Sequence, residues 1–243
     1  MEQPRKTTGK RNQTLVIVPA YNEAASIEKA VRSIQDFGFD LIVVNDGSTD
    51  GTAAILQSIG APHINLISNL GIGGAVQTGY KYAQRHGYEI AVQFDGDGQH
   101  DASYISTIIH PIIEGEANLV IGSRFIGNES EFQSSGARRS GIKMLSWALK
   151  IATGKRIHDV TSGFRAADKN TIALFADNYP TDYPEPESIA YAIAQGYSVT
   201  EVPVSMNERS GGSSSISGID IVWYMVKVGL SILLRGTYNR RTD

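Results

Sequence analysis

The stretch Thr14-Leu-Val-Ile-Val-Pro-Ala-Tyr-Asn-Glu23 decides the fold, because it joins a β-branched run to a polar cluster. The run 14–19 predicts a short buried strand that ends at a proline. Three further apolar runs are each followed by a polar cluster: 41–44 by 45–50, 90–94 by 95–101, and 118–121 by 122–124. Helical patterns separate these strands, which predicts a mostly parallel sheet with helices on both faces. Because ligands bind beyond the carboxyl ends of such strands, the four clusters predict one site.

The other elements are predicted from periodicity and turn residues. Helices are predicted over residues 23–37, 52–59, 104–113, 141–152 and 187–195 and after Leu70, and strands over 63–67 and 197–204. Residues 159–165 are predicted to form a loop, and 210–217 a flexible Gly/Ser-rich loop. The polar residues 1–13, with four Lys or Arg, predict a disordered basic tail.

The composition limits the class of protein. The chain has 243 residues, 41% of them hydrophobic, which suits one α/β domain with a large core. It has no cysteine, which excludes a disulfide scaffold, thiol catalysis and cysteine-ligated metal sites. A net charge of −3 and 8% aromatic residues argue against nucleic acid as a partner.

The cluster Asp95-Gly-Asp-Gly-Gln-His100 carries the most chemical information. Asp95 and Asp97 lie two residues apart at a strand end, where both carboxylates can point the same way. Hard divalent cations are held by a few carboxylates together with substrate phosphates, so the pair fits a metal that bridges to a diphosphate. An acidic turn or a calcium loop is the alternative, although the Glu that closes an EF-hand loop is absent.

The glycine-rich stretch 69–79 matches no standard phosphate-binding loop. It lacks the third glycine of a dinucleotide fingerprint and the Gly-Lys-Ser/Thr of a Walker loop, which disfavours a hydride-transfer enzyme. Gly71 and its neighbours therefore fit either a tight loop beside a ligand or close packing.

Taken together, the motifs resemble the family 2 glycosyltransferases, and among them the dolichyl- and polyprenyl-phosphate sugar synthases. The resemblance covers residues 14–217 and rests on Val18–Glu23, Val44–Gly51, Asn69–Gly71, Asp95–His100, Gly122–Arg124, Thr161–Arg165 and Glu201–Pro203. It implies a GT-A fold, a nucleotide-diphosphate sugar donor, a Mg²⁺ or Mn²⁺ cofactor and inversion at the anomeric carbon.

The same resemblance assigns donor-binding roles. It places Pro19, Tyr21, Glu23, Asp46, Gly71, Asp95, Gln99 and Arg209 at the nucleotide sugar, and Asp95 and Asp97 at the metal. Without the resemblance, packing and a favourable charge at a helix N-terminus would be the preferred interpretation of Tyr21 and Glu23.

On the acceptor side, the resemblance assigns Arg124 and either Arg138 or Arg139, with Ser162, to an acceptor phosphate. Guanidinium groups suit phosphate oxygens, but a solvated basic pair is the alternative for the two adjacent arginines. If the acceptor is a hydroxyl, a general base is needed, and Asp159 or Glu187 is the candidate. If the acceptor is a phosphate, the nucleophile is already anionic. The predicted catalytic residues are thus Asp97, Arg124, Asp159 and Glu187.

Residues 218–243 predict an amphipathic helix with a basic end. As a helix, residues 219–234 would be about 24 Å long, short of the roughly 30 Å hydrocarbon layer. The wide apolar face fits a membrane surface, and the alternative is docking on the domain or on a second copy in a homo-oligomer. We expect a cytoplasmic protein, peripheral at the inner face of the membrane.

The resulting hypothesis is a metal-dependent inverting glycosyltransferase. It would transfer a sugar from a nucleotide diphosphate, UDP being favoured, to a lipid-linked acceptor, polyprenyl phosphate being favoured, in the synthesis of cell-surface glycans. The alternatives are transfer to a hydroxyl of a growing polysaccharide or glycolipid, and a non-catalytic sugar-nucleotide binding protein.

Overall fold

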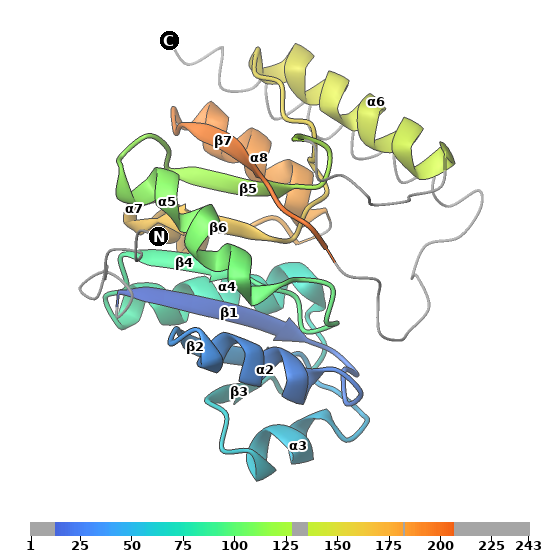
Figure 1. Ribbon diagram of the computed structural model, residues 1–243, viewed down its shortest axis with the longest axis vertical. Helices are drawn as coiled ribbons and strands as arrows, with labels where there is room; N and C mark the ends of the chain where they lie inside the picture. The colour runs from blue at the N-terminus through green and yellow to red at the C-terminus, as the bar shows by residue number, and fades with distance from the viewer. Residues whose placement is uncertain (1–12, 128–135, 182, 207–243) are drawn as a thin grey trace, which may run out of the picture.

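The computed structural model describes residues 13–127, 136–181 and 183–206 (Figure 1). In these residues seven strands form one sheet, in the order β3-β2-β1-β4-β6-β5-β7. The parallel part consists of β1 (Thr14–Ala20), β2 (Asp40–Asn45), β3 (His63–Asn65) and β4 (Ile90–Gln93). β1 is buried along its whole length, as its β-branched run predicts.

The second part of the sheet contains an antiparallel strand. β6 (Arg165–Asp168) runs antiparallel to both β4 and β5 (Leu119–Ser123), and β7 (Val199–Pro203) pairs parallel with β5. The predicted mostly parallel α/β sheet is confirmed. β6 and the helix after it, α7 (Lys169–Asp177), were not among the sequence-based elements.

Helices cover both faces of the sheet, as predicted (Figure 1). One face is covered by α2 (Ile27–Asp36), α3 (Thr52–Ser58) and α5 (Ile105–Ile113), which follows the short η1 (Ala102–Tyr104). The other is covered by α4 (Gly71–Arg85), α6 (Gly136–Thr153), α7 and α8 (Pro184–Ala194). Because strand side chains alternate, Leu15 and Ile17 enter the second core while Val16 and Val18 enter the first.

Three helix starts differ from the prediction by more than one residue, and one of them is that of α8, which begins at Pro184 instead of residue 187. α2 begins at Ile27 instead of residue 23, because the backbone N–H groups of residues 22–24 donate hydrogen bonds to side chains of residues 48–52, between β2 and the start of α3. α6 begins at Gly136, earlier than the predicted residue 141.

The predicted tail 1–13, except Gln13, the loop 210–217 and the segment 218–243 lie outside the described residues. Among the described helices, none is both long and apolar enough to span a bilayer.

Candidate active site

A pocket of about 490 Å³ lies at the carboxyl ends of β1, β2 and β4. Its wall combines the polar clusters that follow these strands with the start of α4: Pro19, Ala20, Tyr21, Glu23, Asp46, Asn69, Gly71, Ile72, Ala75, Asp95, Gly96 and Asp97. We call it the donor pocket. Seven residues that the sequence assigns to donor or metal binding thus line one cavity, although their roles remain proposals.

The loops after β1 and β2 are tied to each other. Asn22 adopts a left-handed backbone with φ 56°, and its Oδ1 accepts a hydrogen bond from the Thr49 backbone N–H at 2.8 Å. The Asn22 backbone N–H donates to Ser48 Oγ at 2.9 Å, and that of Ala24 to Asp50 Oδ2 at 3.1 Å. These bonds fix the pocket wall that carries Tyr21 and Glu23.

Asp46 connects β2 to the start of α4. Its backbone N–H donates to the Ala20 carbonyl at 2.9 Å, and its buried Oδ1 accepts the Leu70 N–H at 2.7 Å. Gly71 follows with φ +78°, a conformation that glycine adopts without strain. Further along α4, a Cβ at Gly79 would collide with Ile17. Gly79 therefore serves close packing, whereas Gly71 forms a tight turn at the wall of the pocket.

Asp95 is held by neighbours on three sides. Its backbone N–H donates to His100 Nδ1 at 2.9 Å, and Gln93 Nε2 lies 3.4 Å from its Oδ1. A Cβ on Gly163 would lie 2.5 Å from Asp95 Oδ2, so only glycine lets this loop approach so closely. Asp97 is also fixed, since its Oδ1 accepts the Gln99 N–H at 3.0 Å.

His100 is a neutral buried side chain between the two halves of the site. Burial lowers its pKa, against the opposing charges of Asp95 and Asp97. Because Nδ1 accepts the Asp95 N–H, the proton is assigned to Nε2, which lies 3.7 Å from Asp95 Oδ2. The imidazole stacks on Phe164 with ring centroids 4.9 Å apart. His100 therefore supports Asp95 instead of carrying a charge itself.

Arg124 and Asp159 form a buried bidentate ion pair. Arg124 Nε donates to Asp159 Oδ2 at 2.7 Å, and Nη2 donates to Oδ1 at 2.8 Å and to Thr161 Oγ1 at 3.1 Å. The Arg124 backbone N–H also donates to Oδ2 at 3.0 Å. Both carboxylate oxygens thus accept hydrogen bonds, which favours a positioning role for Asp159 over that of a general base.

Sequence reasoning assigned no individual role to Arg165, which is buried, or to Glu185, which is half-buried. The guanidinium of Arg165 is fully buried and donates to the Ser162 and Glu185 carbonyls and, at 2.8 Å, to Ser188 Oγ. Burial raises the pKa of Glu185, although the positive charge of Arg165 opposes the shift. The charge of Asp95 also contributes to this rise. For Glu185 the sequence offered one signal, since it lies two residues before Glu187 in Pro184-Glu-Pro-Glu187.

Ser162 and Glu187 lie next to this network. Ser162 is buried, and its Oγ accepts the Phe164 N–H at 3.3 Å. Glu187 is buried in the first turn of α8. Neither lines the donor pocket.

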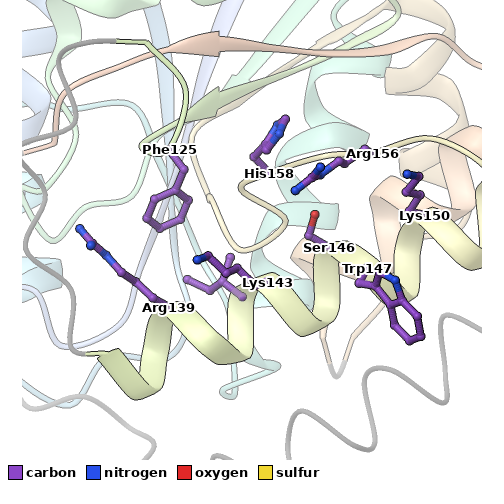
Figure 2. Close-up of a pocket in the computed structure, with 9 residues that line it drawn as sticks. Phe125, Arg139, Lys143, Ser146, Trp147, Lys150, Arg156 and His158 are labelled. Carbon is purple, nitrogen blue, oxygen red and sulfur yellow. The ribbon is translucent and has the colours of Figure 1, made fainter.

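A second pocket, of about 480 Å³, lies between α6 and the chain that leaves β5 (Figure 2). We call it the basic pocket. It is lined by Phe125, Arg139, Ile142, Lys143, Ser146, Trp147, Lys150, Arg156 and His158. Phe125 and His158 directly follow and precede Arg124 and Asp159 in the chain, so the buried ion pair stands at its edge. Arg139 lines this pocket, whereas the side chain of Arg138 and all of Arg209 lie outside the described residues.

Comparison with known proteins agrees with this geometry. The profile of glycosyl transferase family 2 matches residues 15–173. The chain belongs to this family. It is 30% identical, over 89% of its length and 85% of the relative's, to the polyprenol monophosphomannose synthase of Mycolicibacterium smegmatis. It is 33% identical, over 78% of its length and 83% of the relative's, to the UDP-N-acetylglucosamine–dolichyl-phosphate N-acetylglucosaminyltransferase of Methanococcus voltae.

Comparison with solved structures agrees at the level of the fold. Glucosyl-3-phosphoglycerate synthase from Mycobacterium tuberculosis, solved with Mn²⁺, UDP-glucose and phosphoglyceric acid, superposes with a TM-score of 0.70. The match is 22% identical and covers 93% of this chain and 80% of that one. The predicted GT-A fold and the prediction of a glycosyltransferase are therefore confirmed.

Proposed function

We propose that this glycosyltransferase transfers a sugar, with inversion, from a UDP-sugar to a polyprenyl phosphate. The observation that carries the proposal is the arrangement of two pockets around one charged centre. The donor pocket contains Asp95 and Asp97, and the basic pocket begins beside Arg124 and Asp159. His100 Nδ1 accepts the Asp95 N–H at 2.9 Å, and the charges of all four residues influence the pKa of His100.

The residues of the donor pocket fit a divalent cation whose coordination shell is completed by oxygen atoms of the substrate. Among the described residues no group of three or more acidic or His side chains could hold a metal alone. Two adjacent carboxylates at the pocket wall suit Mg²⁺ or Mn²⁺, which commonly take further ligands from substrate phosphates. Asp95 and Asp97 would hold the ion, and when bound it would neutralise the departing diphosphate as a Lewis acid.

The proposed donor roles follow from the pocket wall. Tyr21, with 48% of its surface exposed, offers a ring against the base, and Glu23 and Asp46 offer acceptors for base or ribose. UDP is supported by the donor in the name of the Methanococcus voltae relative and by the UDP-glucose bound to the mycobacterial structure. We place Gln99 near the metal and assign Arg209 to the diphosphate on the sequence motif alone.

The proposed acceptor is an anionic phosphate held by arginines. Asp159 fixes the guanidinium of Arg124, which gives a phosphate a positive charge of defined orientation. Arg139 lines the basic pocket and would provide a second cation, with Ser162 and Arg138 as the remaining candidates. Support comes from the names of relatives, which act on polyprenol, dolichyl phosphate and, in Micrococcus luteus, undecaprenyl phosphate.

Inversion follows if the acceptor attacks from the face of the sugar opposite the diphosphate. A phosphate oxygen needs no general base at neutral pH, so Glu187 would shape the site without moving a proton. The chain's own contribution would be to hold Asp95 and Asp97 against the diphosphate and Arg124 against the nucleophile.

Transfer to a hydroxyl is the second candidate, and Glu185 is the observation that favours it. A half-buried carboxyl with a raised pKa suits a general base. The mycobacterial structural neighbour was solved with phosphoglyceric acid, which carries both a phosphate and a hydroxyl.

A lipid acceptor implies work at a membrane surface. We propose that the enzyme is peripheral at the inner face of the membrane, with residues 218–243 contributing apolar and basic side chains. This part of the proposal rests on the sequence of that segment.

The deciding experiment offers the full chain a panel of UDP- and GDP-sugars with Mn²⁺. Undecaprenyl phosphate in detergent is one acceptor, and undecaprenol, which has only a hydroxyl, is the matched control. We expect a lipid-phosphate sugar from a UDP donor, identified by mass spectrometry, with an inverted anomeric centre by NMR. Product only from hydroxyl acceptors would overturn the phosphate assignment and favour Glu185 as a base.

A further inference from the structure

The outer side of α6 carries large apolar side chains in contact with solvent. Met144, Trp147 and Ile151 are 43%, 66% and 50% exposed, and their spacing of three and four residues places them on one face. We call these three residues the α6 stripe. Such a row is unusual on a surface helix of a soluble protein. Large exposed apolar patches mark sites of interaction.

This exposure belongs to a firmly packed helix. The opposite side of α6 places Ile142, Leu145 and Leu149 in the core, with exposures of 3% or less. Ser146 Oγ also donates to the Ile157 carbonyl and so ties α6 to the chain that follows it. The stripe is therefore presented on a rigid element, at the end of the molecule opposite α3 (Figure 1).

Cations border the stripe. Residues 136–158 include six Lys or Arg and no Asp or Glu, in a chain whose net charge is −3. Arg139, Lys143 and Lys150 are exposed on α6 beside the stripe. In Figure 2 Arg139 and Lys143 lie toward Phe125, whereas the indole of Trp147 extends away from His158.

We propose that the α6 stripe and its flanking cations bind the surface of an anionic lipid bilayer. Trp and Met side chains would enter the acyl boundary, while the Lys and Arg stems reach up to lipid phosphates. A membrane explains the combination better than a protein partner, because the excess positive charge of residues 136–158, which include no Asp or Glu, matches a surface of uniform negative charge. Attraction to an acidic protein would account for the cations but not for the exposed apolar side chains of the α6 stripe.

This inference rests on the proposed function, since it names the surface from which a lipid-linked acceptor reaches the basic pocket. It is nevertheless separable, because membrane binding requires neither nucleotide sugar nor polyprenyl phosphate. It also differs from the assignment of membrane contact to residues 218–243, and the chain provides a probe for each.

The probes are its two tryptophans, Trp147 on α6 and Trp223 in the C-terminal segment. The variant Trp223→Phe leaves Trp147 as the single fluorophore, and Trp147→Phe leaves Trp223. With vesicles of phosphatidylcholine and phosphatidylglycerol that carry brominated acyl chains, we expect Trp147 emission to shift to the blue and to be quenched. Quenching of Trp223 alone would overturn the proposal and leave membrane contact to the C-terminal segment.

Vesicle flotation of the full chain tests the stripe without tryptophan. We expect Met144→Ser/Ile151→Ser to bind about tenfold more weakly, because apolar area is lost from the contact. Ile67→Ser, at an exposed apolar residue on a distant loop, is the matched control and should bind as the wild type does. Binding should also weaken with salt and with removal of phosphatidylglycerol.

Two further measurements separate other outcomes. Transfer to a short, detergent-dispersed prenyl phosphate should be unchanged in Met144→Ser/Ile151→Ser, so loss of the proposed function and loss of membrane binding give different results. If this variant instead converts a dimer to a monomer by light scattering, with vesicle binding unaltered, the stripe is a contact between copies and the proposal is wrong.

Discussion

Arg124 and Asp159 lie in a bidentate ion pair that is almost wholly buried, with 6% and 0% of their side chains exposed. Such a pair positions a charge, and the loss of one partner leaves the other uncompensated in a poorly solvated site. The pair also joins the chain after β5 to the loop before β6, so it connects the two sides of the basic pocket.

We predict that Asp159→Asn lowers the free energy of unfolding by about 3–5 kcal/mol. Urea denaturation of Asp159→Asn, Arg124→Met and the double variant would give the coupling between the two side chains. The exposed pair of Arg32 and Glu28 is the control, and Glu28→Gln should cost less than about 1 kcal/mol. Additive effects of the two buried substitutions would contradict the pairing.

Asp97→Asn should abolish metal-dependent nucleotide binding. With one carboxylate of the pair removed, we expect UDP affinity in Mn²⁺ to fall to the level measured in EDTA, by isothermal titration calorimetry. Asp101→Asn is a matched control, because Asp101 lies in the same acidic segment and only caps η1 through the Ser103 N–H. Undiminished Mn²⁺-dependent binding of UDP by Asp97→Asn would contradict the assignment of Asp97 as a metal ligand.

Gly163→Ala should act through Asp95. A methyl group there would lie 2.5 Å from Asp95 Oδ2, so the carboxylate must move. We expect a fall of about tenfold or more in Mn²⁺-dependent UDP affinity, because metal ligands tolerate little displacement. Gly51→Ala, where the nearest atom would be 3.8 Å away, should leave this affinity unaltered. Equal affinities in both variants would contradict the role of Gly163.

Glu185 should make stability depend on pH. Burial raises the pKa of its carboxyl in the folded protein above the ordinary value, so the folded state binds the proton more tightly than the unfolded state. The resulting stabilisation is complete below the unfolded pKa and is lost as pH rises through the folded pKa.

Measured as Tm between pH 4 and pH 8 without metal, the wild type should therefore lose stability relative to Glu185→Gln as pH rises. The two curves should become parallel above the folded pKa. Parallel curves across the whole range would show that burial does not shift the pKa of the Glu185 carboxyl.

Arg139→Met should weaken binding of the acceptor and leave binding of the donor unchanged. Loss of a charged contact to phosphate costs about 1.5–3 kcal/mol, so KM for polyprenyl phosphate should rise more than tenfold. The Kd for the UDP-sugar should stay within twofold, and Arg32→Met on the exposed surface should alter neither value. If the Kd for the donor rises together with the KM for the acceptor, Arg139 contacts the nucleotide sugar.

The sequence predicts β1, β2, β4 and β5 well because each is a largely apolar run that closes at a polar cluster. β6 gives no such signal: Arg165-Ala-Ala-Asp168 is short, begins with an arginine and has no β-branched residue. It is a strand only because β4 and β5 offer hydrogen-bonding edges on both sides. For α7 a signal was present, since Asp168 caps the helix by accepting the Thr171 N–H at 2.8 Å.

The sequence by itself determined the parallel strands β1, β2 and β4, the edge at which their polar clusters meet and the place of Asp95 and Asp97 at that edge. These follow from local patterns, because strand period and turn residues act within a few positions. Only the tertiary structure decided that Asp159 holds Arg124, that Gly163 touches Asp95 and that Arg165 approaches Glu185. These contacts join residues 20 to 68 positions apart, and their geometry depends on how β4, β5 and β6 come together.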